Sequence, residues 1–193
     1  MADDGSQTPP RFDGEEVNAL LPETARHLLT PEPRDGATCH PAPGVVLVCD
    51  LSGFSRMGAE TVATSERGAE ALQQVIDAVF ARIGAVIARH GGAVLSYAGD
   101  AVAVHWPATV DPGAPLRAAL ACGLAVQREV GDDPVGDRSI EMRAGVGVGE
   151  MYLVDTAAVG GRQAVFCGPL LEGLAGLDLV KGGVRLTPAA LAL

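Results

Sequence analysis

GVVLVCDLSGF, residues 44–54, is the stretch that decides the fold. An unbroken β-branched and apolar run that ends in an Asp and a Gly-bearing turn is typical of a central strand buried on both faces. Downstream, apolar residues recur at helical spacing over residues 68–89, and His90-Gly91-Gly92 is a typical helix stop. The sequence therefore predicts a buried strand followed by a long amphipathic helix.

Further along the chain, strands and helices alternate in an order that suits an α+β sandwich. AVLSYAGDAVAVHWP (93–107) predicts two strands joined through Gly99-Asp100, which is a hairpin signal. We expect, in chain order, a helix over 114–130, a polar loop over 132–137, a strand pair over 139–154, a strand over 162–167, a helix over 169–177, and a strand and an incomplete helix at the end. This order predicts helices on one face of a mostly antiparallel sheet.

The first 43 residues differ in composition from the rest and are expected to form an N-terminal arm. Residues 1–15 carry Asp, Gly and Pro and predict disorder, whereas 16–29 have the apolar spacing of a short helix interrupted by Pro22. Residues 30–43 hold four prolines and predict an extended linker. We therefore place the folded domain at 44–193.

Composition limits the class of protein. With 193 residues, 48% of them hydrophobic, the chain is long enough for one domain with a real core. A net charge of −10 argues against a nucleic-acid partner and leaves nucleotides open, because a metal ion and local cations can hold an anionic ligand. The sequence shows no signal-peptide core and no apolar run of membrane-spanning length, so we expect a cytoplasmic protein without membrane contact.

Four cysteines, at positions 39, 49, 122 and 167, form no CxxC pair, and three of them lie in apolar runs. Buried free thiols are the expectation, and a zinc site is not.

Two aspartates at strand ends carry the functional interpretation. Asp50 closes the first strand and Asp100 lies in the hairpin turn. Alone, each could be a turn residue that caps local amides. If the first strand lies beside the hairpin, both carboxylates converge, and two hard oxygen ligands suit Mg²⁺ or Mn²⁺ bound together with phosphates. The turn at 52–55 could expose amides to a phosphate, and Arg143 is either a surface charge or a phosphate clamp.

These residues lie in three motifs that together resemble the class III adenylyl and guanylyl cyclases. CDLSGFSRM (49–57) resembles their first signature, HGGAVLSYAGDAVAVHW (90–106) their second, and MRAGVGVGEMY (142–152) the strand pair that follows. The resemblance runs from about Leu20 to the C-terminus. It is greatest to the first catalytic domain of soluble, bicarbonate-responsive adenylyl cyclases, through LLP (20–22), RGAEAL (67–72), GEMYLV (149–154) and VFCGPLLEGLAGL (165–177).

The resemblance implies a ferredoxin-like cyclase fold, a dimer with the active site between two domains, and catalysis with two Mg²⁺ or Mn²⁺ ions. Carried over by position, Asp50 and Asp100 are metal ligands, Leu51 offers a carbonyl ligand, and Arg143 clamps phosphate. The residues implied to contact the nucleotide are Leu51, Ser52, Gly53, Phe54, Ser55 and Gly99. The implied reaction converts ATP to cyclic AMP and pyrophosphate, with the ribose 3′-hydroxyl attacking the α-phosphate.

The complementary half-site of the family is missing from this sequence. Its Lys and Asp, which recognise adenine, fall at Ser96 and Val165, and its Asn and Arg, which stabilise the transition state, fall at Glu172 and Gly176. The Lys and Arg that bind bicarbonate fall at Ser96 and Ala175. A homodimer is therefore predicted to be inactive or very weak.

Three interpretations follow. The chain is the metal-binding half of an adenylate cyclase that needs a complementary partner domain, a pseudo-cyclase that binds a nucleotide or a protein without turnover, or a dimerisation scaffold. The choice between ATP and another nucleoside triphosphate such as GTP stays open, because the positions that recognise the base are absent.

Overall fold

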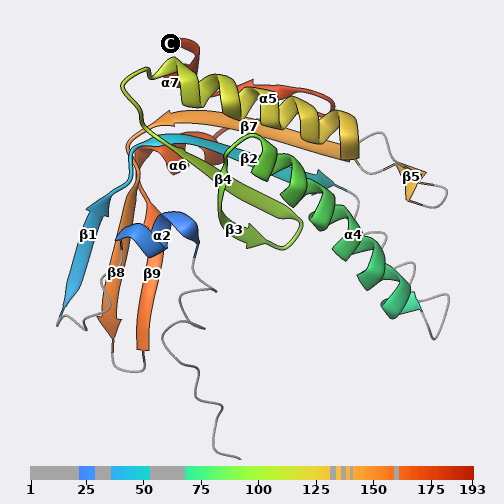
Figure 1. Cartoon of the computed structure of the whole chain (residues 1–193), viewed down its shortest axis with the longest axis horizontal. Helices are drawn as coiled ribbons and strands as arrows, with labels where there is room; N and C mark the ends of the chain where they lie inside the picture. Colours follow the sequence, from blue (N-terminus) through green and yellow to red (C-terminus); the bar gives the residue numbers. More distant parts are fainter. Residues whose placement is uncertain are drawn as a thin grey trace, which may run out of the picture.

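A central, mostly antiparallel sheet, with the GVVLVCD strand in its middle, organises the molecule (Figure 1). The computed structural model describes residues 22–28, 36–52, 68–130, 134–135, 138–139, 141–158 and 161–193. Within these residues the central sheet has the order β10 (Val184–Leu186), β7 (Glu141–Gly149), β2 (Gly44–Ser52), β4 (Ala101–Pro107), β3 (Ala93–Ala98). β2 is antiparallel to both neighbours, and β10 is parallel to β7. The predicted buried strand and the predicted hairpin are confirmed.

The two long helices cover one face of this sheet (Figure 1). α4 (Gly68–Arg89) has the predicted bounds, and α5 (Gly113–Val130) begins one residue before its predicted start. Alternate residues of β2, Val45, Leu47, Cys49 and Leu51, are buried in the core cluster that these helices complete. The period of two in β2 thus fixes which of its side chains face the helices and which face away.

The opposite face is covered at one end by the short helix α6 (Pro169–Ala175). Leu170 and Leu174 of α6 pack with Val46 of β2 in a second, smaller cluster. Gly147 of β7 makes this approach possible, because a Cβ there would lie 2.8 Å from a Leu170 methyl carbon. The predicted α+β class is confirmed, and α6 lies on the face of the sheet for which the sequence predicted no helix.

A smaller sheet joins three described strands in the order β1 (Ala37–Pro41), β8 (Tyr152–Ala158), β9 (Gly161–Cys167). The linker prediction is wrong for residues 37–41, which pair antiparallel with β8, so that His40 lies opposite Leu153. A proline-rich segment can form an edge strand, because an edge strand has a hydrogen-bonded neighbour on one side only and needs fewer of its backbone amides as donors. This segment is a strand because it pairs with β8, which is distant in the sequence, so local sequence patterns could not predict it.

Within the described part of the predicted N-terminal helix, residues 22–28, the helix is present as α2 (Glu23–Leu28). The rest of that predicted helix, 16–21 and residue 29, lies outside the described residues. Ala25 is buried, and Thr24 Oγ1 lies 3.2 Å from Nδ1 of the buried His105. α2 therefore packs on the sheet face that points away from α4 and α5, since His105 alternates with the core residues Val104 and Trp106. The domain boundary at residue 44 stays a prediction.

The remaining elements are short. β5 (Pro134–Val135) and β6 (Arg138–Ser139) form a small hairpin where a polar loop was expected, and α7 (Pro188–Leu191) follows β10 as predicted. Within the part of the chain that the structure describes, no helix is long and apolar enough to cross a membrane.

The cysteine prediction is half right. Cys49 and Cys122 are buried free thiols, but Cys39 and Cys167 are exposed on the smaller sheet.

Candidate functional site

Asp50, Asp100 and Arg143 meet at one end of the central sheet. In the strand register, Asp50 of β2 lies opposite Ala101 of β4 on one side and Arg143 of β7 on the other. Asp100 immediately precedes Ala101, and its carbonyl accepts a hydrogen bond of 3.1 Å from the Leu51 amide. The convergence expected from the sequence is therefore what the fold produces.

The turn before β4 sets the position of Asp100. Gly99 has φ of +64°, a left-handed conformation that glycine adopts without strain, and no other atom lies within 4 Å of the place where a Cβ would stand. The tight turn between β3 and β4 thus holds Asp100 beside the end of β2. Gly99 shapes this site through the backbone.

The Asp50 and Arg143 side chains belong to the face of the sheet that points away from α4 and α5. Leu51 is fully buried towards the helices, so its neighbour Asp50 projects to the opposite side. Arg143 likewise alternates with Met142 and Ala144 of the helix-side core. Asp50, Asp100 and Arg143 are each partly exposed. A ligand can therefore reach them from solvent, while Leu51 can offer only its backbone.

The environment of Asp50 favours a bound cation. Burial raises the pKa of the Asp50 carboxyl, the negative charge of Asp100 raises it further, and the Arg143 guanidinium partly offsets both. A carboxylate that is costly to ionise in the ligand-free protein gains from a positive charge placed between it and its acidic neighbour.

The donor set fits Mg²⁺ or Mn²⁺ when a phosphate ligand is bound with it. Mg²⁺ is usually held by one or two carboxylates plus substrate phosphates, rather than by a cage made entirely of protein atoms. Among the described residues no group of three or more His, Cys, Asp and Glu side chains could hold a metal. Asp50 and Asp100 supply two hard oxygen ligands, which is the number such a shared site needs.

Two residues that sequence reasoning missed flank this site. Lys181 Nζ donates to Glu141 Oε1, and the backbone of Lys181 forms an isolated antiparallel bridge with Arg143. Glu141 is the first residue of β7, opposite Ser52 of β2. Lys181 lies in a loop between α6 and β10, where local sequence carries no functional signal.

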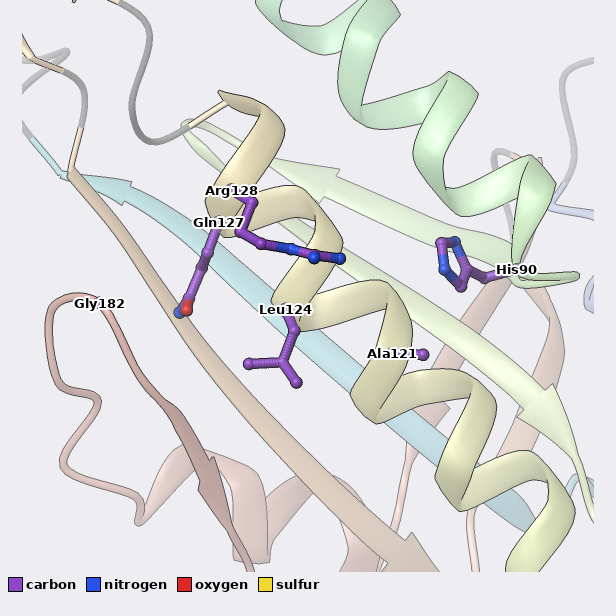
Figure 2. Close-up of a pocket in the computed structure, with 6 residues that line it drawn as sticks. All are labelled: His90, Ala121, Leu124, Gln127, Arg128 and Gly182. Carbon is purple, nitrogen blue, oxygen red and sulfur yellow. The ribbon is translucent and has the colours of Figure 1, made fainter.

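A separate hollow of about 570 Å³ lies on the outer face of α5 (Figure 2). Its lining residues are His90, Ala121, Leu124, Gln127, Arg128 and Gly182. The Gln127 side chain crosses part of the hollow, because its Nε2 donates a hydrogen bond of 2.6 Å to the Gly183 carbonyl. This hollow is on the helix side of the sheet and contains none of the predicted site residues.

Comparison with known proteins identifies the fold. No protein-family model and no curated protein sequence matches the chain. Among solved structures, the adenylyl cyclase CyaB from P. aeruginosa is 19% identical over 81% of each chain, with a TM-score of 0.63. The guanylyl cyclase Cya2 is 22% identical over 81% of this chain and 79% of its own, with a TM-score of 0.62. The guanylate cyclase domain of RhGC from Catenaria anguillulae, solved with GTP, is 14% identical over 79% and 82%, with a TM-score of 0.61.

The chain has the class III nucleotide cyclase fold. In this cyclase fold the predicted site residues are brought together as far as the structure describes them. Gly53, Phe54 and Ser55 lie outside the described residues, so their predicted phosphate contacts stay predictions. Ser52 is the last described residue of β2, and its backbone is placed opposite Glu141.

The four positions that the sequence resemblance assigns to a complementary half-site lie on other elements than Asp50. Ser96 is on β3, Val165 is on β9 with 56% of its surface exposed, and Glu172 is in α6, which is capped by Gly176. Asp50, in contrast, lies on β2. The two sets of positions are therefore carried by different parts of one domain.

Proposed function

We propose that the chain is a nucleotide cyclase domain and acts as the metal-binding half of an adenylate cyclase, converting ATP to cyclic AMP and pyrophosphate with a complementary partner domain. The observation that carries this proposal is the meeting of Asp50, Asp100 and Arg143 at the open end of a sheet with the cyclase topology. The resemblance to the soluble adenylyl cyclases supports ATP as the substrate and the cytoplasm as the location.

In the proposed reaction, Asp50 and Asp100 would hold Mg²⁺ or Mn²⁺ together with the triphosphate, and the Leu51 carbonyl would be a further ligand. Metal bound there supplies Lewis-acid activation of the ribose 3′-hydroxyl and neutralises the leaving pyrophosphate. Arg143, one strand from Asp50, donates from its guanidinium to a phosphate oxygen and orients the chain of phosphates.

The partner domain has to supply what Ser96, Val165, Glu172 and Gly176 do not. None of these four can replace a base-recognising Lys and Asp or a transition-state Asn and Arg. The cost of losing such groups is commonly a factor of about 10² to 10³ in rate for a single donor. We therefore expect a homodimer to be inactive or very weak, and a bicarbonate response is not expected because Ser96 and Ala175 are uncharged.

The test is reconstitution. The chain is mixed with a cyclase domain that carries the missing Lys, Asp, Asn and Arg but lacks the two aspartates, and cyclic AMP formed from ATP and Mn²⁺ is measured. We expect turnover from the mixture only, loss of it with Asp50→Ala, and normal turnover with Asp111→Ala. Asp111 is a matched control, because its ion pair with Arg117 is on the surface beyond the other end of β4. Unchanged turnover with Asp50→Ala would show that the metal assignment is wrong.

A second candidate function is a pseudo-cyclase that binds a nucleotide or a protein partner without turnover. The four substituted positions favour it. Calorimetry with Mn²⁺ and a non-hydrolysable ATP analogue on the isolated chain measures binding, and the reconstitution assay with ATP measures product. Binding together with no product in any pairing supports the pseudo-cyclase, whereas product in one pairing excludes it.

A further inference from the structure

The hollow on the outer face of α5 combines an exposed apolar side chain with an arginine (Figure 2). Leu124 is 50% exposed although it lies inside a long helix. Ala121 and Arg128 lie one turn before it and one turn after it, on the same stripe of α5. In Figure 2, Leu124 points away from α4, whereas the Arg128 side chain extends towards the side on which His90 lies, at the end of α4. The hollow therefore has an apolar part and a cationic part.

Hydrogen bonds hold the walls of the hollow on both sides of α5. On one side, Gln127 Nε2 donates to the Gly183 carbonyl at 2.6 Å. On the other side, Trp106 Nε1 donates a hydrogen bond of 2.8 Å to the His90 carbonyl, and His90 Nδ1 lies 2.8 Å from the Val86 carbonyl. Because a carbonyl can only accept, this Nδ1 carries a proton. The walls are thus fixed before a ligand binds, which lowers the entropic cost of binding.

The cationic part of the hollow carries an excess of positive charge. Arg89 Nη2 donates to both carboxylate oxygens of Glu129, at 2.7 and 2.8 Å, and Arg82 donates to the Glu129 backbone carbonyl. The hydrogen bond from Arg89 lowers the pKa of Glu129, and the nearby charge of Arg128 lowers it further. Among the residues that the structure describes, Arg128 itself forms no ion pair. Three guanidinium groups therefore gather around one carboxylate in a chain whose net charge is −10, and this part of the surface attracts an anion.

The size and the chemistry of the hollow suit a small molecule. Its volume of about 570 Å³ lies within the range of about 300–1,000 Å³ that small-ligand sites commonly have. A guanidinium group binds a carboxylate through two parallel hydrogen bonds. An apolar chain that covers Leu124 and Ala121 removes their exposed carbon atoms from water. The ligand that fits is an amphiphile with one acidic group and a short apolar chain.

We propose that this hollow is a binding site for a small carboxylate with an apolar chain, whose acid binds Arg128 and whose chain covers Leu124. Glu129 is already bound by Arg89, which leaves the Arg128 guanidinium for the ligand. The site does not depend on the proposed function, because α5 lies on the face of the sheet opposite to the one that carries Asp50. A ligand in the hollow therefore does not compete with a nucleotide for space.

The experiment is calorimetric titration of the full chain with sodium octanoate, with acetate and octanol as probes that carry only the acid or only the chain. We expect one octanoate per chain, and binding of acetate and of octanol that is weaker by about tenfold or more. Arg128→Gln and Leu124→Ser should each weaken octanoate binding about fivefold, with thermal unfolding of each variant as a check of folding. Arg117→Gln is the matched control and should change nothing, because Arg117 is an exposed arginine of the same helix that is paired with Asp111.

Three results would overturn the proposal. If octanoate does not bind, or binds equally well to the wild type, Arg128→Gln and Leu124→Ser, the hollow is not the site. If only Leu124→Ser weakens binding, the hollow is an apolar surface that does not recognise the acid. If a triglutamate peptide binds more tightly than octanoate and loses affinity with Arg128→Gln, the hollow takes an acidic protein segment instead of a small carboxylate.

Discussion

Replacing Asp50 by Asn should stabilise the metal-free protein and abolish its response to metal. The pKa of Asp50 is raised from its ordinary value of 3.8, so the native state binds this proton more tightly than the unfolded chain does. The ionised native carboxylate is then a source of instability that grows as pH rises through the window above 3.8. An amide of nearly the same shape removes it.

The size of the effect follows from the neighbours of Asp50. Charges on adjacent strands about 6 Å apart, in a partly exposed setting, interact by roughly 1 kcal/mol. Repulsion from Asp100 raises the pKa of Asp50, and attraction to Arg143 opposes it. The desolvation of the carboxylate is the largest cause of the shift. Because the side chain is only partly buried, we expect Asp50→Asn to stabilise the protein by about 0.5–1 kcal/mol at pH 7.

Metal bound with a nucleotide should reverse the order of stability of the wild type and Asp50→Asn. In the assay, urea unfolding is followed at pH 7 in EDTA, and again in Mn²⁺ with a non-hydrolysable ATP analogue. Ligand at ten times its dissociation constant stabilises the wild-type protein by about 1.4 kcal/mol. The wild type should therefore be less stable than Asp50→Asn in EDTA and more stable than it with ligand.

The control is Asp111→Asn, on the surface at the start of α5. Hydrogen bonds from Arg117 and the Gly113 amide lower the pKa of Asp111, so its loss should destabilise the protein above pH 4 and leave the response to metal intact. If Asp50→Asn is no more stable than wild type in EDTA, the electrostatic reasoning is refuted. If ligand stabilises Asp50→Asn as much as wild type, Asp50 is not a metal ligand.

Three further predictions concern the fold. Burial lowers the pKa of His105 from 6.5, so the unfolded state takes up a proton that the native state resists, and urea unfolding should show a loss of stability between pH 7.5 and 5 that His105→Gln removes. Gly147→Val should cost about 1–3 kcal/mol in urea unfolding by pushing α6 from the sheet, whereas Gly84→Ala, with no atom within 4 Å of the new Cβ, should stabilise α4 by up to about 1 kcal/mol. Burial raises the pKa of Cys49 to about 12, so mass spectrometry should find iodoacetamide at pH 8 on the exposed Cys39, and on Cys49 only after unfolding.

Local patterns were sufficient for elements whose partners are close in the chain. The helix over 68–89 and the hairpin through Gly99-Asp100 are found where the apolar spacing and the turn residues predict them. Local patterns failed for β1, because residues 37–41 become a strand only by pairing with β8, more than a hundred residues later. They also missed the position of α6, which depends on the absence of side chains at Gly145 and Gly147 on a distant strand.

The candidate site shows the same division. Asp50 and Asp100 could be predicted to meet, since Asp50 lies near the end of β2 and Asp100 immediately precedes β4, two strands of a sheet that the pattern already implied. Lys181 could not, because only a backbone bridge from a loop brings it beside Arg143. The sheet end thus gathers residues of two kinds, and only those at the ends of regular elements are recognisable from sequence.

A crystal structure of the chain with Mn²⁺ and a non-hydrolysable ATP analogue tests the central claim most directly. The anomalous signal of manganese should appear within about 2.5 Å of a carboxylate oxygen of both Asp50 and Asp100, with the triphosphate beside Arg143. Manganese bound elsewhere, or a nucleotide bound without contact to either aspartate, would contradict the proposal that this sheet end is the metal-binding half of a cyclase.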